Sequence, residues 1–322
     1  MNSLYEGILK GLRRVLSSVP AAVPPFMGPD EASDRLFGLL AEGKPCMVAR
    51  FGSVELNAVV NARGVQAGPH PVAFIRGKAP QWWWNARGME EMQANAGFFP
   101  ADEQHILRFS QLMESDAREL DLLASWRPEE RFLPELSSVG KIPLVYLEPW
   151  WSVRPWTRIL EGKRVLVIHP FSAQIEAQYA HAREHLFASP DVLPPFTLLT
   201  LPAVQSIGGE AKGYADWFEA LRGMETKMDS LQYDIALLGC GAYGFPLAAH
   251  AKRTGHQAVH MGGALQLLFG IKGRRWEDPQ YGVREWGLPE GYYPGLFNEY
   301  WIRPGDAARP RNADQVENAC YW

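Results

Sequence analysis

Residues 234–276 read DIALLGCGAYGFPLAAHAKRTGHQAVHMGGALQLLFGIKGRRW and carry the main signal for the fold. Two short apolar runs, 234–238 and 257–260, are each followed by a glycine-rich turn and then by a segment with helical spacing. Two successive units of strand, turn and helix predict parallel strands in an α/β protein. Ligands of such sheets bind outside the carboxyl ends of the strands, where these glycine turns lie.

The same alternation of strand and helix runs through the rest of the chain. We expect further strands at 44–51, 164–169 and 198–201, and helices at 30–42, 53–60, 101–125, 173–187 and 215–231. Strands that alternate with helices of this length favour an α/β fold with a Rossmann-like, mostly parallel sheet and helices on both of its faces.

Three parts of the chain differ in composition. Residues 1–29 comprise a predicted helix and a proline-rich connector, 30–276 form the Rossmann-like domain, and 277–322 are an irregular, aromatic-rich wrapping segment. The N-terminal helix has Lys10, Arg13 and Arg14 on its polar side. We expect it to pack on the domain or a partner, with contact to a membrane surface as the alternative.

Composition excludes several classes of protein. With 47% hydrophobic and 21% charged residues the chain is globular, and a net charge of -4 provides no overall basic field for nucleic acid. Its three cysteines, Cys46, Cys240 and Cys320, lack metal-type spacing and favour reduced thiols. No apolar run of about 18 residues is present to span a bilayer. We therefore expect a cytoplasmic protein, at the inner face of the membrane if the N-terminal helix contacts lipid.

The turn at 239–244 has the G-x-G-x-x-G spacing of a dinucleotide-binding motif. A nicotinamide site also needs an acidic residue about 20 positions later to hold the ribose. Val259, His260 and Met261 occupy that place, so we expect no NAD, and an NAD(P)-dependent oxidoreductase is the least favoured function. The alternative for these glycines is that packing alone requires them.

Four predicted strand ends carry polar or glycine-rich turns, at 50–55, 169–172, 239–244 and 260–263. Glycines allow close approach of a ligand, and helix N-termini bind phosphate, so a diphosphate is the expected ligand. Arg50 is suited to pair with phosphate, and Glu55 to hold a divalent cation or a sugar hydroxyl. The alternative is that Arg50 and Glu55 form a local ion pair at the start of a helix.

Other polar and aromatic residues near these turns are open to two interpretations. His169 and His260 either bind phosphate or accept a proton, or they are neutral imidazoles that hydrogen-bond to the backbone. Tyr243 is suited to stack on a base or sugar, and Gln266 to bind sugar hydroxyls. Glu210 and Lys212 lie either on a loop over the site or on an exposed turn.

The segment 50–55, RFGSVE, resembles the Arg-Phe-Gly-Asp-Gly-Glu signature of the GT-D type bacterial glycosyltransferases. The blocks at 162–171, 239–244, 262–266 and 269–276 also look like this family, so the resemblance extends over residues 30–276. It implies transfer of a sugar from a nucleoside diphosphate, with UDP the expected nucleotide, to a glycan or glycolipid acceptor in bacterial surface polysaccharide or glycoprotein assembly. A homo-oligomer is a further expectation.

The resemblance implies a catalytic role for Arg50 and Glu55. It also implies that the nucleotide sugar binds along the strand-end turns, where the expected contacts are Phe51, Gly52, Ser53, His169, Pro170, Gly239, Gly241, Ala242, Tyr243, Gly262, Gly263, Gln266 and Lys272. In the family an acidic pair is associated with Mn²⁺ or Mg²⁺. Here Ser53 replaces the Asp and Val54 the Gly, so Glu55 alone is left as a metal ligand. Either Arg50, Lys272 and helix N-termini offset the diphosphate charge, or the chain is a non-catalytic binding subunit.

Overall fold

The computed structural model describes residues 3–17, 27–206, 213–305 and 320–322. Within them, seven strands form one sheet in the order β3-β2-β1-β7-β6-β4-β5, and every pairing is parallel. The strands are β1 (Cys46–Ala49), β2 (Leu122–Ser125), β3 (Gly140–Pro143), β4 (Arg164–His169), β5 (Thr197–Pro202), β6 (Ile235–Leu238) and β7 (Gln257–His260). The predicted α/β class with a parallel sheet is confirmed.

Side chains of the central strands alternate between two apolar clusters, one on each face of the sheet. In β1, Met47 and Ala49 belong to one cluster, whereas Cys46 and Val48 belong to the other. All four residues of β1 are buried, as are all four of β6. Strands covered on both faces read as continuous apolar runs, which is why these segments show no alternation in the sequence.

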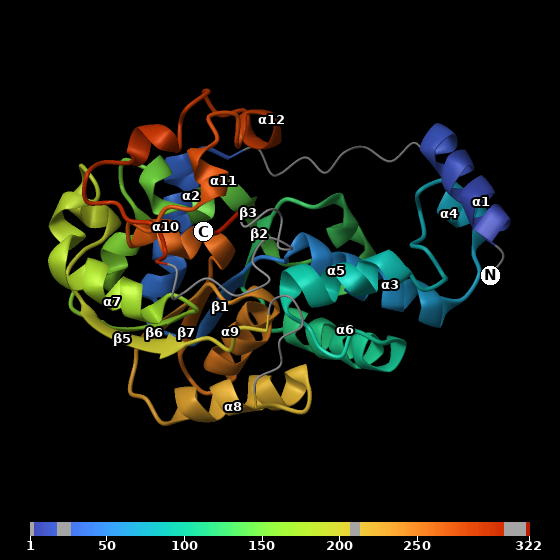
Figure 1. The fold of residues 1–322 in the computed structure, drawn as a ribbon, viewed down its shortest axis with the longest axis horizontal. Helices are drawn as coiled ribbons and strands as arrows, with labels where there is room; N and C mark the ends of the chain where they lie inside the picture. The colour runs from blue at the N-terminus through green and yellow to red at the C-terminus, as the bar shows by residue number, and fades with distance from the viewer. Residues whose placement is uncertain (1–2, 18–26, 207–212, 306–319) are drawn as a thin grey trace.

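Helices cover both faces of the sheet (Figure 1). Apolar residues of α3 (Ser53–Ala67), α5 (Ala86–Ala96), α6 (Glu103–Ala117), α8 (Trp217–Asp229) and α9 (Gly244–Arg253) fill the cluster that contains Met47. Those of α2 (Pro29–Ala41), α7 (Ser172–His181), α10 (Leu265–Leu268) and α11 (Arg274–Glu277) fill the cluster that contains Val48.

Two strands differ from the sequence prediction. The predicted helix over 101–125 ends at Ala117, and its last residues form β2 instead. The run LLAS is too short to show a strand period and is buried on both faces. Strand β3, GKIP, was not predicted. It lies at the sheet edge and ends on Pro143, which an edge strand tolerates because it needs no ladder hydrogen bond on its outer side.

The strand order places a topological switch beside β1. From β1 the chain continues to β2 and β3 on one side, and it returns on the other side so that β7 pairs with β1. Crevices outside the carboxyl ends of the strands at such a switch are the usual ligand sites of open α/β sheets. The carboxyl ends of β1 and β7 are therefore the expected place for a site.

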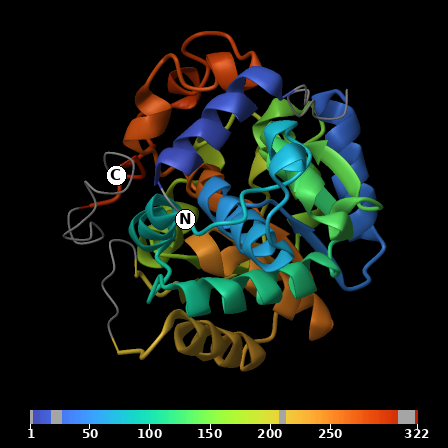
Figure 2. The same ribbon diagram turned by 90° about the vertical axis from the view of Figure 1, so that its right-hand side faces the viewer.

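The two ends of the chain take different places. Tyr293 and Trp301 of the C-terminal segment, which includes α12 (Val283–Trp286), pack into the same apolar cluster as α2 and α7. At the other end, α1 (Ser3–Leu16) packs on α4 (Pro71–Ile75), away from α7 (Figure 1), and lies at the surface in the turned view (Figure 2). Most of the predicted proline-rich connector lies outside the described residues. The three-part division of the chain stays a prediction.

Within the ranges that the structure describes, no helix combines the length and apolar character needed to cross a membrane.

Candidate functional site

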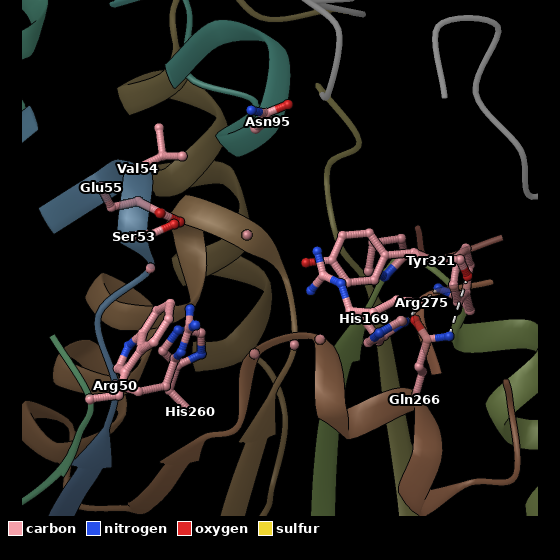
Figure 3. A pocket seen from close by; sticks show the side chains of 18 of the residues that line it. Arg50, Ser53, Val54, Glu55, Asn95, His169, His260, Gln266, Arg275 and Tyr321 are labelled. Carbon is pink, nitrogen blue, oxygen red and sulfur yellow. Dashed lines mark hydrogen bonds between the residues drawn. The ribbon is translucent and has the colours of Figure 1, made fainter. Parts of the chain in front are cut away.

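A cavity of about 320 Å³ opens at the carboxyl ends of β1, β4, β6 and β7. Figure 3 shows Arg50 and His260 on one side of it and His169, Arg275, Gln266 and Tyr321 on the other. The structure thus brings together most of the residues predicted from the four turns. Those that line the cavity are Arg50, Gly52, Ser53, Glu55, His169, Pro170, Gly239, Gly241, His260, Gly262, Gly263 and Gln266.

Glu55 lies in the first turn of α3, whose N-cap is Gly52. Its carboxylate folds back over Gly52, where the methyl group of an alanine would overlap it. Burial raises the pKa of the Glu55 carboxyl, and the charge of Arg50 lowers it in part. The turn therefore holds a single carboxyl group over the N-terminus of a helix, facing the cavity.

Arg50 follows the last residue of β1 and is held over the ring of Trp126, with its Cζ 5.3 Å from the ring centroid. Burial lowers the pKa of the guanidinium, and the nearby Glu55 raises it. Among the described residues the structure shows no hydrogen bond from its guanidinium and no direct ion pair with Glu55. Arg50 and Glu55 therefore act on each other through their charges without direct contact, and both line the cavity.

The two cavity histidines have opposite tautomers. His169 Nδ1 accepts a hydrogen bond of 3.0 Å from the backbone N–H of Phe171, so its proton is on Nε2. His260 Nδ1 lies 3.2 Å from the carbonyl oxygen of Leu238, which only accepts, so Nδ1 carries the proton there. Burial lowers the pKa of each to about 3. His169 thus offers a donor at Nε2 and His260 an acceptor at Nε2.

The glycines of the 239–244 turn leave space for the two imidazole rings. A methyl group on Gly239 would overlap the His169 ring and the carbonyl oxygen of Gly262, and one on Gly244 would overlap the His260 ring. Gly241 has φ +57, a conformation that favours glycine. Close packing of the two histidines accounts for this spacing without a dinucleotide.

Three buried polar atoms on the cavity wall have no hydrogen-bond partner among the described residues: Asn95 Oδ1, Gln205 Nε2 and Gln266 Oε1. The amide nitrogen of Gln266 donates to the carbonyl oxygens of Ile271 and Tyr321, which leaves only its oxygen for a ligand. An unpaired buried polar atom costs about 1–3 kcal/mol. These atoms have almost no accessible surface, so a ligand in the cavity meets them only where the wall side chains turn toward it.

An aromatic wall, which the sequence did not predict as part of the site, closes the cavity. It consists of Trp126, Tyr281, Trp286 and Tyr321. Arg275 lies between two of these rings, with its Cζ 5.1 Å from the centroid of Tyr321 and 5.7 Å from that of Tyr281. The available signal was the high aromatic content of the C-terminal segment, which we interpreted only as wrapping.

Four residues predicted in the site lie outside the cavity lining. Phe51 and Ala242 are buried in the core, and Tyr243 stacks on Trp217 with its ring centroid 4.9 Å away, so it is not placed to stack on a ligand. Lys272 is paired with Glu277 at 3.6 Å. Among the basic residues Arg275, not Lys272, joins Arg50 at the cavity. The predicted loop residues Glu210 and Lys212 lie outside the described residues.

The described residues hold no preformed all-protein site for Mn²⁺ or Mg²⁺. No three His, Cys, Asp or Glu side chains come together as metal ligands in this part of the chain. Glu55 is the carboxylate at the α3 turn, and Ser53 supplies a neutral hydroxyl beside it, so a divalent cation here would need oxygens of the ligand or of water as well. The cations of the cavity are guanidinium groups instead.

Comparison with known proteins leaves the chain without a family assignment. No protein-family profile matches it, and no curated protein is similar to it in sequence. Two solved structures are similar over 96% of this chain and 98% of theirs, at 12% identity and TM-scores of 0.35 and 0.34. Both are of the domain of unknown function 1792, described for one of them as having "a distinct glycosyltransferase fold". These identities and TM-scores are too low to assign this chain to a family.

Proposed function

We propose that this chain is a glycosyltransferase that binds a nucleoside-diphosphate sugar in the cavity and transfers the sugar to a glycan or glycolipid acceptor. One observation carries the proposal. Arg50 lines the cavity with a guanidinium that makes no direct ion pair among the described residues, beside the N-terminus of α3 and at the topological switch of a parallel sheet. Helix N-termini and arginine forks are the two protein groups best suited to a diphosphate.

The remaining polar atoms suit the sugar. The side-chain amides of Asn95, Gln205 and Gln266 line the cavity, and each has one atom without a hydrogen-bond partner among the described residues: an acceptor in Asn95 and Gln266, a donor in Gln205. Sugar hydroxyls both donate and accept, so a sugar satisfies a mixed set of this kind. The aromatic wall adds flat apolar surface for a sugar face or a base.

In the proposed reaction, the acceptor hydroxyl oxygen bonds to the anomeric carbon while the bond from that carbon to the diphosphate oxygen breaks. The proton of the hydroxyl passes to water or to the departing diphosphate. Negative charge develops on the leaving diphosphate. Arg50 stabilises that charge. Glu55 orients the sugar through its hydroxyls, and alignment of the two reactants supplies much of the rate.

A second function, a non-catalytic subunit that binds nucleotide sugar or glycan, is favoured by one observation. Ser53 occupies the position of the aspartate in the signature, so Glu55 is the one carboxylate that the α3 turn contributes to the cavity. This alternative keeps the ligand and removes the reaction.

A turnover assay separates the two functions. Purified protein is incubated with UDP-, GDP- and dTDP-sugars, and release of nucleoside diphosphate is measured for wild type, Glu55→Gln and the exposed control Glu90→Gln. We expect turnover in wild type and in the control, and loss of at least about 100-fold in Glu55→Gln because a misplaced substrate reacts slowly. Nucleotide-sugar binding with no turnover in wild type supports the binding subunit. Equal turnover in wild type and Glu55→Gln contradicts the role of Glu55.

A further inference from the structure

Helix α1 exposes an apolar face. Leu4, Ile8, Leu12, Val15 and Leu16 have exposed fractions of 71%, 53%, 41%, 80% and 55%. Their spacing of three, four or one residues puts them on one side of a helix, together with Tyr5. Val72 of the adjoining α4 is 60% exposed. We call these seven residues the α1 patch, and outside it the large apolar residues exposed in the described chain are Val153 and Tyr300.

The side of α1 next to the patch is the side that packs. Leu9 is buried against Phe74 of α4 and Trp83. Arg13 donates a 2.9 Å hydrogen bond to the carbonyl oxygen of Ala79 and lies 4.5 Å over the Phe74 ring. Packing on the domain therefore accounts for one side of the helix and leaves the apolar patch uncovered by the described residues.

Charge around the patch differs from that of the whole chain. Residues 3–17 and 70–80 contain Lys10, Arg13, Arg14, Arg76 and Lys78 against the single acidic residue Glu6, whereas the chain as a whole has a net charge of -4. From outside these segments, Arg131 and Glu129, one charge of each sign, also act on Arg13. All of these basic residues except the half-buried Arg13 are exposed. Long basic side chains extend from an apolar surface to reach anionic groups. The combination of exposed apolar side chains and local positive charge matches an anionic lipid surface.

We propose that the α1 patch docks this protein on the surface of an anionic phospholipid bilayer. The 14 residues of α1 are too few to span a bilayer, so the helix lies in the interface with the patch among the acyl chains and the basic residues near the headgroups. This docking surface is separate from the cavity, and it holds whether or not the proposed transferase activity does.

Vesicle co-sedimentation tests the proposal with the full chain. The vesicles are phosphatidylcholine alone, or phosphatidylcholine mixed with phosphatidylglycerol. We expect wild type to sediment with the anionic vesicles and to be released by high salt. The triple variant Ile8→Ser, Leu12→Ser, Val15→Ser should bind at least about tenfold more weakly because it removes apolar contact. Val153→Ser, a matched change at a residue 84% exposed elsewhere, should bind like wild type.

A charge-reversal variant and a measurement of self-association test the proposal further. Arg14→Glu with Lys78→Glu should weaken binding to anionic vesicles and leave the thermal unfolding midpoint unchanged, since both residues are exposed. Wild type that stays in the supernatant with anionic vesicles at low salt overturns the proposal. Equal sedimentation of the triple variant and wild type also overturns it. A wild-type dimer in light scattering that is a monomer in the triple variant overturns it as well, because the patch would then join two copies of the chain.

Discussion

His169 and His260 tie the stability of the protein to pH. Burial lowers the pKa of both from 6.5 to about 3. Because the unfolded chain binds these protons below about pH 6.5 and the folded chain does not, the stability present above pH 6.5 is lost as the pH falls toward 3. Each histidine therefore lowers the free energy of unfolding by ~2 kcal/mol between pH 7 and pH 5.

The variant His169→Asn isolates this contribution. The asparagine side-chain oxygen occupies the place of Nδ1 and retains the hydrogen bond from Phe171, but it does not titrate. The free energy of unfolding is measured with denaturant at pH 7 and at pH 5. Its decrease between the two pH values should be smaller by ~2 kcal/mol in the variant than in wild type. An unchanged difference would mean that His169 is protonated in the folded protein.

Gly52 controls the position of Glu55. Its φ of -66 and ψ of 148 are accessible to alanine, yet the added methyl would overlap the Glu55 carboxylate. We expect Gly52→Ala to fold with a similar unfolding midpoint and to lose activity by roughly 10–100-fold, since the carboxylate moves. Gly38→Ala, in a helix with open space around the glycine, is the control and should retain activity. Equal turnover in Gly52→Ala and wild type would show that the position of Glu55 is immaterial.

Among the elements, short apolar runs with glycine turns were predictable and short buried segments without them were not. The predicted bounds of β4 and β7 agree with the structure, because each run ends in a turn with clear chemistry. Strand β2 was hidden at the end of a helical pattern. The four turns were predicted to meet because the carboxyl ends of parallel strands share one edge of the sheet.

The rest of the site depends on tertiary contacts. Trp126 and Asn95 come from segments with no motif, and Tyr321 reaches the cavity because Gln266 binds its carbonyl oxygen. Tyr243 lies in the expected turn but faces Trp217, a contact that spacing does not reveal. Sequence identifies which turns surround a site, whereas the direction of each side chain depends on packing.

The C-terminal segment is predicted to be part of the binding site rather than a cover for the core. Removing the Tyr321 ring opens the aromatic wall beside Arg275. We expect Tyr321→Ala to weaken binding of the nucleotide sugar by about tenfold, from the loss of stacking and of buried area. Tyr300→Ala, in the same segment but 40% exposed and outside the cavity, should bind like wild type. Calorimetric titration of both variants tests this, and equal affinities would remove Tyr321 from the site.

The cavity holds two guanidinium groups beside two carboxylates. Arg50 and Arg275 line it together with Glu55 and Glu285, and within the described chain no three candidate ligands gather for a metal ion. We expect a chelator to change the affinity for UDP by less than about twofold, because charged hydrogen bonds from arginine supply the recognition. Loss of binding in chelator with recovery in Mn²⁺ would show that a metal held partly by the ligand itself is needed.

Binding of a nucleoside diphosphate through Arg50 is the central claim for this protein, and isothermal titration calorimetry tests it most directly. UDP, GDP and their sugars are titrated into wild type, Arg50→Gln and Arg76→Gln, the last an exposed arginine far from the cavity lining. We predict binding to wild type and Arg76→Gln, and at least about tenfold weaker binding to Arg50→Gln, since a charge-assisted pair contributes about 1.5–3 kcal/mol. No binding of any nucleotide to wild type, or equal affinity in Arg50→Gln, would contradict the account.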